Sequence, residues 1–148
     1  MPSLYRSVIA VALAALTATP AWALEFRSIV ADAAVLYDAP SAKARKLYVV
    51  NRGYPVEVVV VVEGWVKVRD ANGDLTWVES KALSDRRTVM IKVPLAQIRQ
   101  AADDGAPVVF QAQQNVILEL EDVVGAWLRV KHRDGQGGFI KAADVWGA

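Results

Sequence analysis

The stretch GYPVEVVVVVEGWVKVRDANGDLTWV, residues 53–78, decides the fold of this chain. It contains five consecutive valines, Val58 to Val62, which taken alone could form a membrane segment, a buried strand or an aggregation-prone run. A related stretch 62 residues later removes the ambiguity. WVKVRDANGDLTWVESKAL (65–83) aligns without a gap with WLRVKHRDGQGGFIKAADV (127–145).

The two stretches agree in polarity and in turn residues rather than in identity. Trp65 aligns with Trp127, and the same offset holds upstream, where Val56-Glu57-Val58 aligns with Leu118-Glu119-Leu120. Internal similarity at a fixed period indicates a repeated structural unit. The sequence therefore predicts two homologous domains, residues 24–86 and residues 87–148.

Each repeat consists of short apolar runs separated by turn signals. Asn72-Gly73-Asp74 and Asp134-Gly135 lie between alternating apolar and polar segments, which is a strong hairpin signal. No segment after residue 23 shows a helical period with caps. The pattern predicts an all-β fold, with a small barrel or sandwich in each repeat.

The second repeat explains the valine run. Positions 56, 58, 59 and 60 align with Leu118, Leu120, Glu121 and Asp122, in that order. Because side chains alternate between the two faces of a strand, Val56 and Val58 are expected to face the core. Val59 is expected on a face that tolerates charge, and Val60 near a bend. The run is therefore interpreted as a strand followed by a bulge or turn.

The first 23 residues have the features of a secretory signal peptide. A short segment with one positive charge, Arg6, precedes an apolar run over residues 7–18, and Pro20 precedes the cleavage pattern Ala21-Trp22-Ala23. The apolar run is shorter than the ~20 residues of a membrane-spanning helix. We expect cleavage after Ala23, a periplasmic or secreted protein, and no membrane insertion after cleavage.

Composition excludes several classes of function. The chain has no cysteine, which rules out disulfides, thiolate catalysis, cysteine–zinc sites and lipidation of an N-terminal cysteine. Of its 17 Lys and Arg residues one is Arg6, which leaves 16 basic against 16 acidic residues after the predicted cleavage. This balance gives no support for nucleic-acid binding, which needs a concentrated basic surface.

Two polar motifs are better explained as structure than as chemistry. Asp70, Asn72 and Asp74 have the initial spacing of a calcium loop, but Leu75 and Lys81 stand where that loop needs Gly and Glu. A hairpin turn is expected there. The acidic cluster of Glu119, Glu121 and Asp122 is not repeated in the first unit, so an exposed strand face is expected rather than a carboxylate pair for glycoside hydrolysis.

The single histidine, His132, lies at the second hairpin, where Asp70, expected to be a solvent-facing turn residue, is its counterpart in the first repeat. A catalytic histidine needs a nucleophile and an orienting acid. One histidine without cysteine is also too few ligands for a zinc site. The sequence therefore predicts no catalytic residues, no metal site and no cofactor.

Four short motifs carry a resemblance to a known family. They are Ala39-Pro40-Ser41, Arg52-Gly53-Tyr54-Pro55, Gly64-Trp65-Val66-Lys67-Val68 and Trp77-Val78. Together they resemble the bacterial SH3-like domain, and the resemblance extends over both repeats. The second repeat departs from it, with Ala102-Asp103, Asn115 and Ala126 in place of Pro40-Ser41, Gly53 and Gly64. The resemblance implies a barrel of five to six strands per repeat, and a binding function rather than catalysis.

Large aromatic residues are the candidate ligand contacts. Strand alternation places Trp65 and Trp77 on the face that carries charged side chains, and their counterparts Trp127 and Phe139 likewise. Exposed aromatic rings often mark binding surfaces. The candidate binding residues are Tyr37, Tyr54, Trp65, Trp77, Trp127 and Phe139. The alternatives are that a curved barrel half-buries both of its faces, or that the two units pack together through these rings.

The sequence thus predicts two tandem small SH3-like barrels after a signal peptide, in an exported protein without enzymatic activity. The family resemblance implies a peptide ligand, either from peptidoglycan or from an extended segment of a cell-envelope protein. The alternative function is that of a structural or regulatory subunit whose barrels bind only a partner protein.

Overall fold

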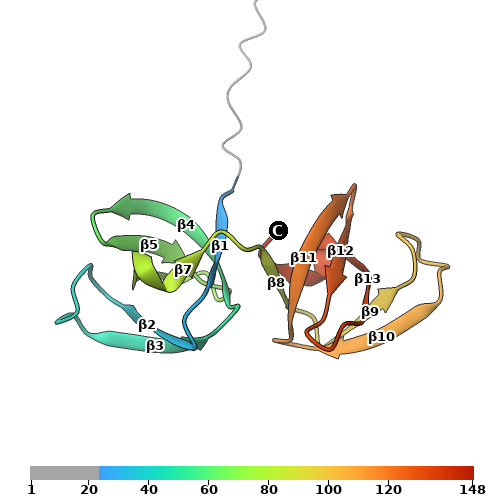
Figure 1. Ribbon diagram of the computed structural model, residues 1–148, viewed down its shortest axis with the longest axis horizontal. Coiled ribbons are helices and arrows are strands. Elements are labelled where there is room, and N and C mark those ends of the chain that lie inside the picture. The colour runs from blue at the N-terminus through green and yellow to red at the C-terminus, as the bar shows by residue number, and fades with distance from the viewer. Residues whose placement is uncertain (1–23) are drawn as a thin grey trace, which may run out of the picture.

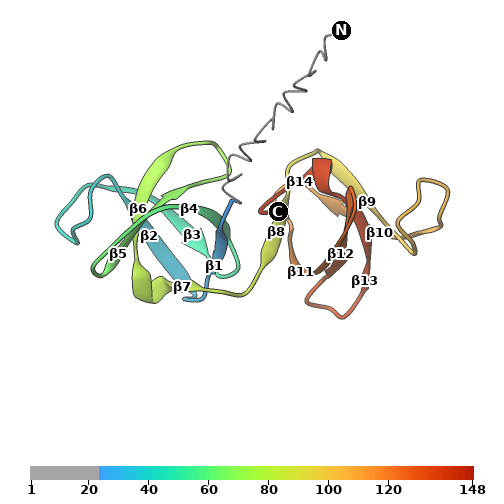
Figure 2. The ribbon, with the colours of Figure 1, turned by 90° about the horizontal axis from the view of Figure 1, so that it is seen from above.

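The computed structural model describes residues 24–148, which form two β-domains lying side by side (Figure 1). Each domain is one antiparallel seven-stranded sheet that bends around its own core, as Figure 2 also shows. The strand order is β3-β2-β6-β5-β4-β1-β7 in the first sheet and β10-β9-β13-β12-β11-β8-β14 in the second. The two orders are the same when each strand is replaced by its repeat counterpart, which confirms the predicted repeat and the all-β fold. The predicted signal peptide, residues 1–23, lies outside the described residues.

Short strands and tight turns make up both domains. Domain 1 contains β1 (Phe26–Ile29), β2 (Ala33–Tyr37), β3 (Lys46–Asn51), β4 (Pro55–Val62), β5 (Trp65–Arg69), β6 (Leu75–Glu79), the 3₁₀ turn η1 (Ser80–Ala82) and β7 (Leu83–Ser84). Domain 2 contains β8 (Thr88–Ile91), β9 (Leu95–Arg99), β10 (Val108–Gln113), β11 (Ile117–Val124), β12 (Trp127–Lys131), β13 (Gly137–Lys141), η2 (Ala142–Asp144) and β14 (Val145–Trp146). Seven strands rather than five to six are present in each domain, because the sheet continues into the two-residue strands β7 and β14.

Each domain has its own apolar core, formed by the inward face of its strands. In domain 1 the alternate residues Val66, Val68 and Val78 are completely buried. Leu128, Val130 and Ile140 occupy the corresponding positions in domain 2 and are also buried. No helix within residues 24–148 is long and apolar enough to cross a membrane.

The valine run lies in strand β4 and contains a β-bulge. Val56 is fully buried, and the half-buried Val58 packs against the same core. The pairing of β4 with β5 shifts register between Val58 and Val60, so Val59 is the extra residue. Because a bulge turns the strand, the rest of the run is exposed at the hairpin. Domain 2 has a register shift at the equivalent place, between Leu120 and Asp122, so the expected strand and bulge are confirmed.

The Asp70 motif is a hairpin turn, as expected, but the expectation of a solvent-facing Asp70 is wrong. Its carboxylate accepts hydrogen bonds from the backbone N–H groups of Asn72 (2.9 Å) and Asp74 (3.0 Å). These bonds turn the side chain back under the loop, and only 2% of the residue is exposed. The carboxylate therefore stabilises the turn, as Asp does in Asx-turns.

The two domains meet at a seam built from β1, β4 and β8 and from the C-terminus, which lies at the junction (Figure 2). The hydroxyl of Thr88 donates a hydrogen bond to the carbonyl of Gly53 at 2.6 Å. Gly53 has a φ of 86°, and a Cβ there would lie 3.3 Å from the Ile117 side chain of domain 2. Glycine thus allows both the turn and the close approach of the second domain.

Candidate binding surfaces

The outer face of domain 1 brings together three of the predicted aromatic residues. Strands β2, β6 and β5 are neighbours in the sheet, and Tyr37 pairs with Trp77, which in turn pairs with Lys67. Trp65 lies on the same face, opposite Glu79. Val66 lies between Trp65 and Lys67 in sequence, and Val78 lies between Trp77 and Glu79; both valines point the other way and are buried in the core. The predicted division between an aliphatic core face and an aromatic, charged outer face is confirmed.

The three rings differ in exposure and in role. The rings of Tyr37 and Trp65 make an edge-to-face contact, with centroids 5.3 Å apart and planes at 85°. Tyr37 is only 8% exposed, whereas Trp65 and Trp77 are half-buried. The Lys67 ammonium lies 5.9 Å from the centre of the Trp77 ring, which is within cation–π range. Tyr37 therefore supports Trp65 from below, and the two tryptophans present the ring surface.

A groove of about 410 Å³ adjoins this face, between β2 and the segment that includes the end of β6 and η1. Its lining is mostly apolar: Ala31, Ala33, Ala34, Val35, Tyr37, Val78, Glu79, Lys81 and Ala82. Strands β2 and β6 pair at a single position, Tyr37 with Trp77, and then diverge. Beyond that position each strand has a neighbouring strand on one side only. The groove therefore combines an apolar floor with two open strand edges.

Domain 2 has a hollow at the equivalent place, but it is smaller, about 210 Å³, and polar. Arg99 replaces Tyr37 opposite Phe139, and its guanidinium donates to the Ala106 carbonyl at 2.8 Å. The Lys141 ammonium lies 2.6 Å from the Asp104 carboxylate. That hydrogen bond lowers the pKa of Asp104.

Charged side chains lie beside both aromatic rings of domain 2: Lys141 beside Trp127, and Arg99 opposite Phe139. The Lys141 ammonium lies 5.8 Å from the centre of the Trp127 ring. Trp127 and Phe139 are both half-buried, as their counterparts Trp65 and Trp77 are in domain 1. The structure thus gives both domains an aromatic outer face, but an apolar groove beside it only in domain 1.

Tyr54 lies apart from the other predicted residues. Its ring packs against the core of domain 1, and its hydroxyl oxygen accepts a hydrogen bond from the Ala71 N–H at 3.1 Å. Burial raises the pKa of this hydroxyl. The hydroxyl therefore holds the β5–β6 hairpin against the core.

The sequence left two structural explanations for the aromatic rings besides ligand binding. The first, half-burial on the outer face of a curved barrel, is present at Trp65, Trp77, Trp127 and Phe139. Packing of the two units through these rings is not, because the ring contact and hydrogen bonds that join the domains are made by other residues, among them Phe26, Trp146, Thr88 and Gly53.

The remaining polar candidates are turn and surface residues. His132 Nδ1 lies 3.3 Å from the Asp134 backbone nitrogen, which donates to it, and 3.1 Å from the Asp134 carboxylate. A backbone hydrogen bond from Gln136 is the main cause that lowers the pKa of Asp134. Glu119 and Glu121 are on the expected exposed strand face and pair with Arg86 and Arg129. Over residues 24–148 there is no group of three or more His, Asp or Glu side chains placed to hold a metal ion.

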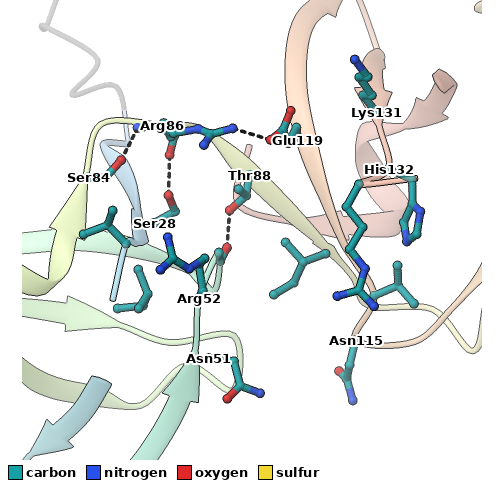
Figure 3. Close-up of a pocket in the computed structure, with 16 residues that line it drawn as sticks. Ser28, Asn51, Arg52, Ser84, Arg86, Thr88, Asn115, Glu119, Lys131 and His132 are labelled. Atoms are coloured by element: carbon teal, nitrogen blue, oxygen red, sulfur yellow. Dashed lines mark hydrogen bonds and ion pairs between the residues drawn. The ribbon is translucent and has the colours of Figure 1, made fainter. Parts of the chain in front are cut away.

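A larger cleft, of about 510 Å³, lies between the two domains (Figure 3). Arg52 comes from the β3–β4 turn of domain 1 and Arg86 from the segment that joins the domains, whereas Lys131 and His132 come from domain 2. No local pattern in the sequence indicates this cleft, since its walls belong to different repeats. The one available hint was the set of basic residues in KHR at 131–133 of the second hairpin.

Comparison with solved structures gives several distant similarities. They include NlpC2 of Trichomonas vaginalis (14% identity, TM-score 0.40, covering 85% of this chain and 49% of that one) and NlpC1 of the same organism (16%, 0.40, 88% and 48%). An NlpC/P60 family protein of Bacillus cereus is 18% identical, with a TM-score of 0.37, covering 82% of this chain and 55% of that protein. This chain thus spans about half the length of these proteins.

No curated protein matches the sequence. The family model of the bacterial SH3 domain matches twice, over residues 30–85 and 92–147. The two matches fall on the two sheets and together cover most of the chain. Both matched regions are SH3 domains, and no catalytic domain is matched. The observed repeat, the repeated sheet order and these two matches lead to one conclusion: the chain belongs to the bacterial SH3 domain family.

Proposed function

We propose that this protein is an exported, non-enzymatic binding protein that recognises an extended peptide of the cell envelope, either a peptidoglycan peptide or a segment of an envelope protein. The observation that carries the proposal is the apolar groove of domain 1 beside Trp65 and Trp77. Its equivalent in domain 2 is smaller and more polar and contains the Lys141–Asp104 ion pair; the groove of domain 1 also contains an ion pair, Glu79–Lys81, but its lining is mostly apolar.

The groove suits an extended peptide for two physical reasons. The open edges of β2 and β6 offer backbone groups to a strand laid between them, and strand addition of this kind is a recurrent mode of peptide recognition. The apolar floor and the half-buried rings of Trp65 and Trp77 offer contact area for alternate side chains of the ligand. Tyr37 holds the Trp65 ring in place, so the surface is formed before a ligand arrives.

Co-sedimentation of the purified protein with purified sacculi tests the proposal. Trp77→Ala should retain most of its thermal stability and lose at least about tenfold in binding, because truncation of a ring at a binding hot spot costs about 2 kcal/mol or more. Trp127→Ala is the matched control. It removes the equivalent ring from the polar face of domain 2 and should bind as the unaltered protein does.

Three outcomes decide between the functions. Loss of binding in Trp77→Ala alone supports the groove. A large loss of stability in Trp77→Ala with unchanged binding per folded molecule contradicts it. Absence of sedimentation together with retention by one envelope protein supports the alternative, a structural or regulatory subunit that binds only a partner protein.

Export is tested separately. The pattern before Ala21-Trp22-Ala23 supports cleavage after Ala23, so N-terminal sequencing of the mature protein should begin at Leu24. A mature protein that still begins at Met1 would remove the assignment to the periplasm or the extracellular space.

A further inference from the structure

We propose that the cleft between the two domains is a second binding site, and that it takes an acidic segment of polypeptide with at least two carboxylates. The site goes beyond the proposed function, because it lies on a different surface from the groove of domain 1 and uses different chemistry.

Positive charge gathers in this cleft. Four cationic side chains line it, Arg52, Arg86, Lys131 and Arg133, against the single carboxylate of Glu119. Residues 24–148 as a whole contain equal numbers of basic and acidic residues. The cleft is therefore a local concentration of charge in an otherwise balanced chain, and such a concentration attracts ligands of the opposite sign.

Three of the four cations are available to a ligand, two of them outside any ion pair and one in a weak, exposed pair. Within residues 24–148, Lys131 and Arg133 form no ion pair, and both are exposed. Arg52 pairs with Asp32 at 2.6 Å, but both side chains are exposed, and an exposed pair is weak enough to be exchanged for a ligand carboxylate. Arg86 pairs with Glu119, which joins the linker segment to β11 and leaves the other three cations to the ligand.

Hydrogen bonds between the two domains and the segment that joins them connect the walls of the cleft. Ser28 donates to the Arg86 carbonyl at 2.7 Å, and Thr88 donates to the Gly53 carbonyl at 2.6 Å; Figure 3 draws both bonds as dashed lines among the residues that line the cleft. These bonds connect β1, the linker segment and β8 with the turn that carries Arg52. A ligand therefore meets cations whose spacing is set by the domain seam.

The rest of the lining favours a peptide over a phosphate polymer. Asn51 and Asn115 add side-chain amides that can pair with peptide groups, and Val30 and Ile117 add apolar surface to the cleft. A phosphate chain can accept hydrogen bonds from the same amides, but it gains nothing from the apolar surface. The cations come from both domains and from the linker segment, so the ligand has to be extended, and a volume of about 510 Å³ accommodates a short segment of chain.

The test uses two synthetic peptides and inorganic polyphosphate as probes. One peptide alternates Glu and Val, and its matched control alternates Gln and Val. Fluorescence anisotropy at low salt measures binding of each labelled peptide, and competition with the labelled Glu–Val peptide measures binding of polyphosphate. The Glu–Val peptide should bind, with an affinity that falls as salt rises, and the Gln–Val peptide should not.

Matched variants locate the site. Lys131→Gln with Arg133→Gln should weaken binding of the Glu–Val peptide about tenfold, since each exposed ionic contact contributes a few tenths to ~1 kcal/mol. Lys43→Gln with Lys92→Gln removes the same charge from exposed residues that do not line the cleft, and should leave binding within about twofold. Trp77→Ala should leave it unchanged, which separates this site from the groove of domain 1.

Three results would overturn the proposal: no binding of the Glu–Val peptide at low salt, an equal loss in both double variants, or tighter binding of polyphosphate that is lost with Lys131 and Arg133. The last result would assign the cleft to phosphate polymers instead.

Discussion

The indole N–H of Trp146 donates a hydrogen bond to the carbonyl of Pro55 at 3.1 Å, across 91 residues of sequence. Trp146 lies in the last strand of domain 2, and Pro55 begins β4 of domain 1. The same indole makes an edge-to-face contact with Phe26, with centroids 5.2 Å apart. The end of the chain thus fastens the second domain to the first. The equivalent residue in domain 1, Ser84, has no such ring.

This relationship predicts that the two domains unfold together. Trp146→Ala should lower the free energy of unfolding by about 2 kcal/mol or more, because it removes the ring contact and the hydrogen bond. Calorimetry should then show two separated transitions in place of one. Trp146→Phe retains a ring and should cost only ~1 kcal/mol. A single unshifted transition in Trp146→Ala would show that Trp146 does not couple the domains.

Two buried threonines should respond in opposite directions to the same substitution. The Thr76 hydroxyl is buried without a hydrogen-bond partner, whereas the Thr88 hydroxyl bonds to Gly53 across the seam. Thr76→Val should stabilise the protein by ~1 kcal/mol, because an unsatisfied buried hydroxyl costs free energy. Thr88→Val should destabilise it by a similar amount. Chemical denaturation measures the free energy of unfolding of both variants. Changes of the same sign would contradict the assigned hydrogen bonding.

The bulge in β4 predicts that charged substitutions at three nearby valines differ sharply in their cost to stability. Val68→Asp places a charge in the core, where Val68 is completely buried, and should cost about 3 kcal/mol or more. Val58→Asp should cost less, because Val58 is only half-buried. Val59→Glu should change stability by no more than about 0.5 kcal/mol, since Val59 is 40% exposed in the bulge. Comparable melting losses for Val68→Asp and Val59→Glu would contradict this arrangement.

Tyr54 predicts a loss of stability at alkaline pH. Burial raises its pKa above the usual 10.0 of a tyrosine hydroxyl. As the pH rises past 10, the hydroxyl ionises in the unfolded chain before it does so in the folded one. Its contribution to stability is therefore complete below that pH and is lost as the pH rises through the folded pKa.

Tyr54→Phe should flatten this alkaline decline, at the cost of leaving the Ala71 N–H without its acceptor. Denaturation curves between about pH 8 and about pH 11 measure the effect. Tyr48→Phe is the comparison: the pKa of Tyr48 is also raised, chiefly by the charge of Asp74, but this tyrosine is exposed, so solvent screens the interaction and the variant should flatten the decline less than Tyr54→Phe does. A Tyr54→Phe variant that declines as steeply as the unaltered protein would contradict the assignment.

The outer-face tryptophans could be predicted from sequence because strand alternation is a local property. Trp65 and Trp77 are placed by the parity of their own strands, and the second repeat confirms that parity. The burial of Asp70 could not be predicted in this way, since it depends on a carboxylate that folds back onto its own turn. The offset of 62 aligns Tyr37 with Arg99, but the effect of this replacement on the groove depends on how the neighbouring strands diverge in the folded sheet.

The sequence by itself determined the repeat, the all-β fold and the face of each strand. The alternation of apolar and polar residues every two positions and the offset of 62 residues between the repeats can both be read from the order of residues. The tertiary structure alone decided the groove of domain 1, the seam and the cationic cleft. Each of these is formed by residues far apart in sequence, such as Arg52 and Lys131, or Pro55 and Trp146. Their proximity depends on how two folded sheets dock, and this docking follows from side-chain packing across the seam, which has no local pattern in the sequence.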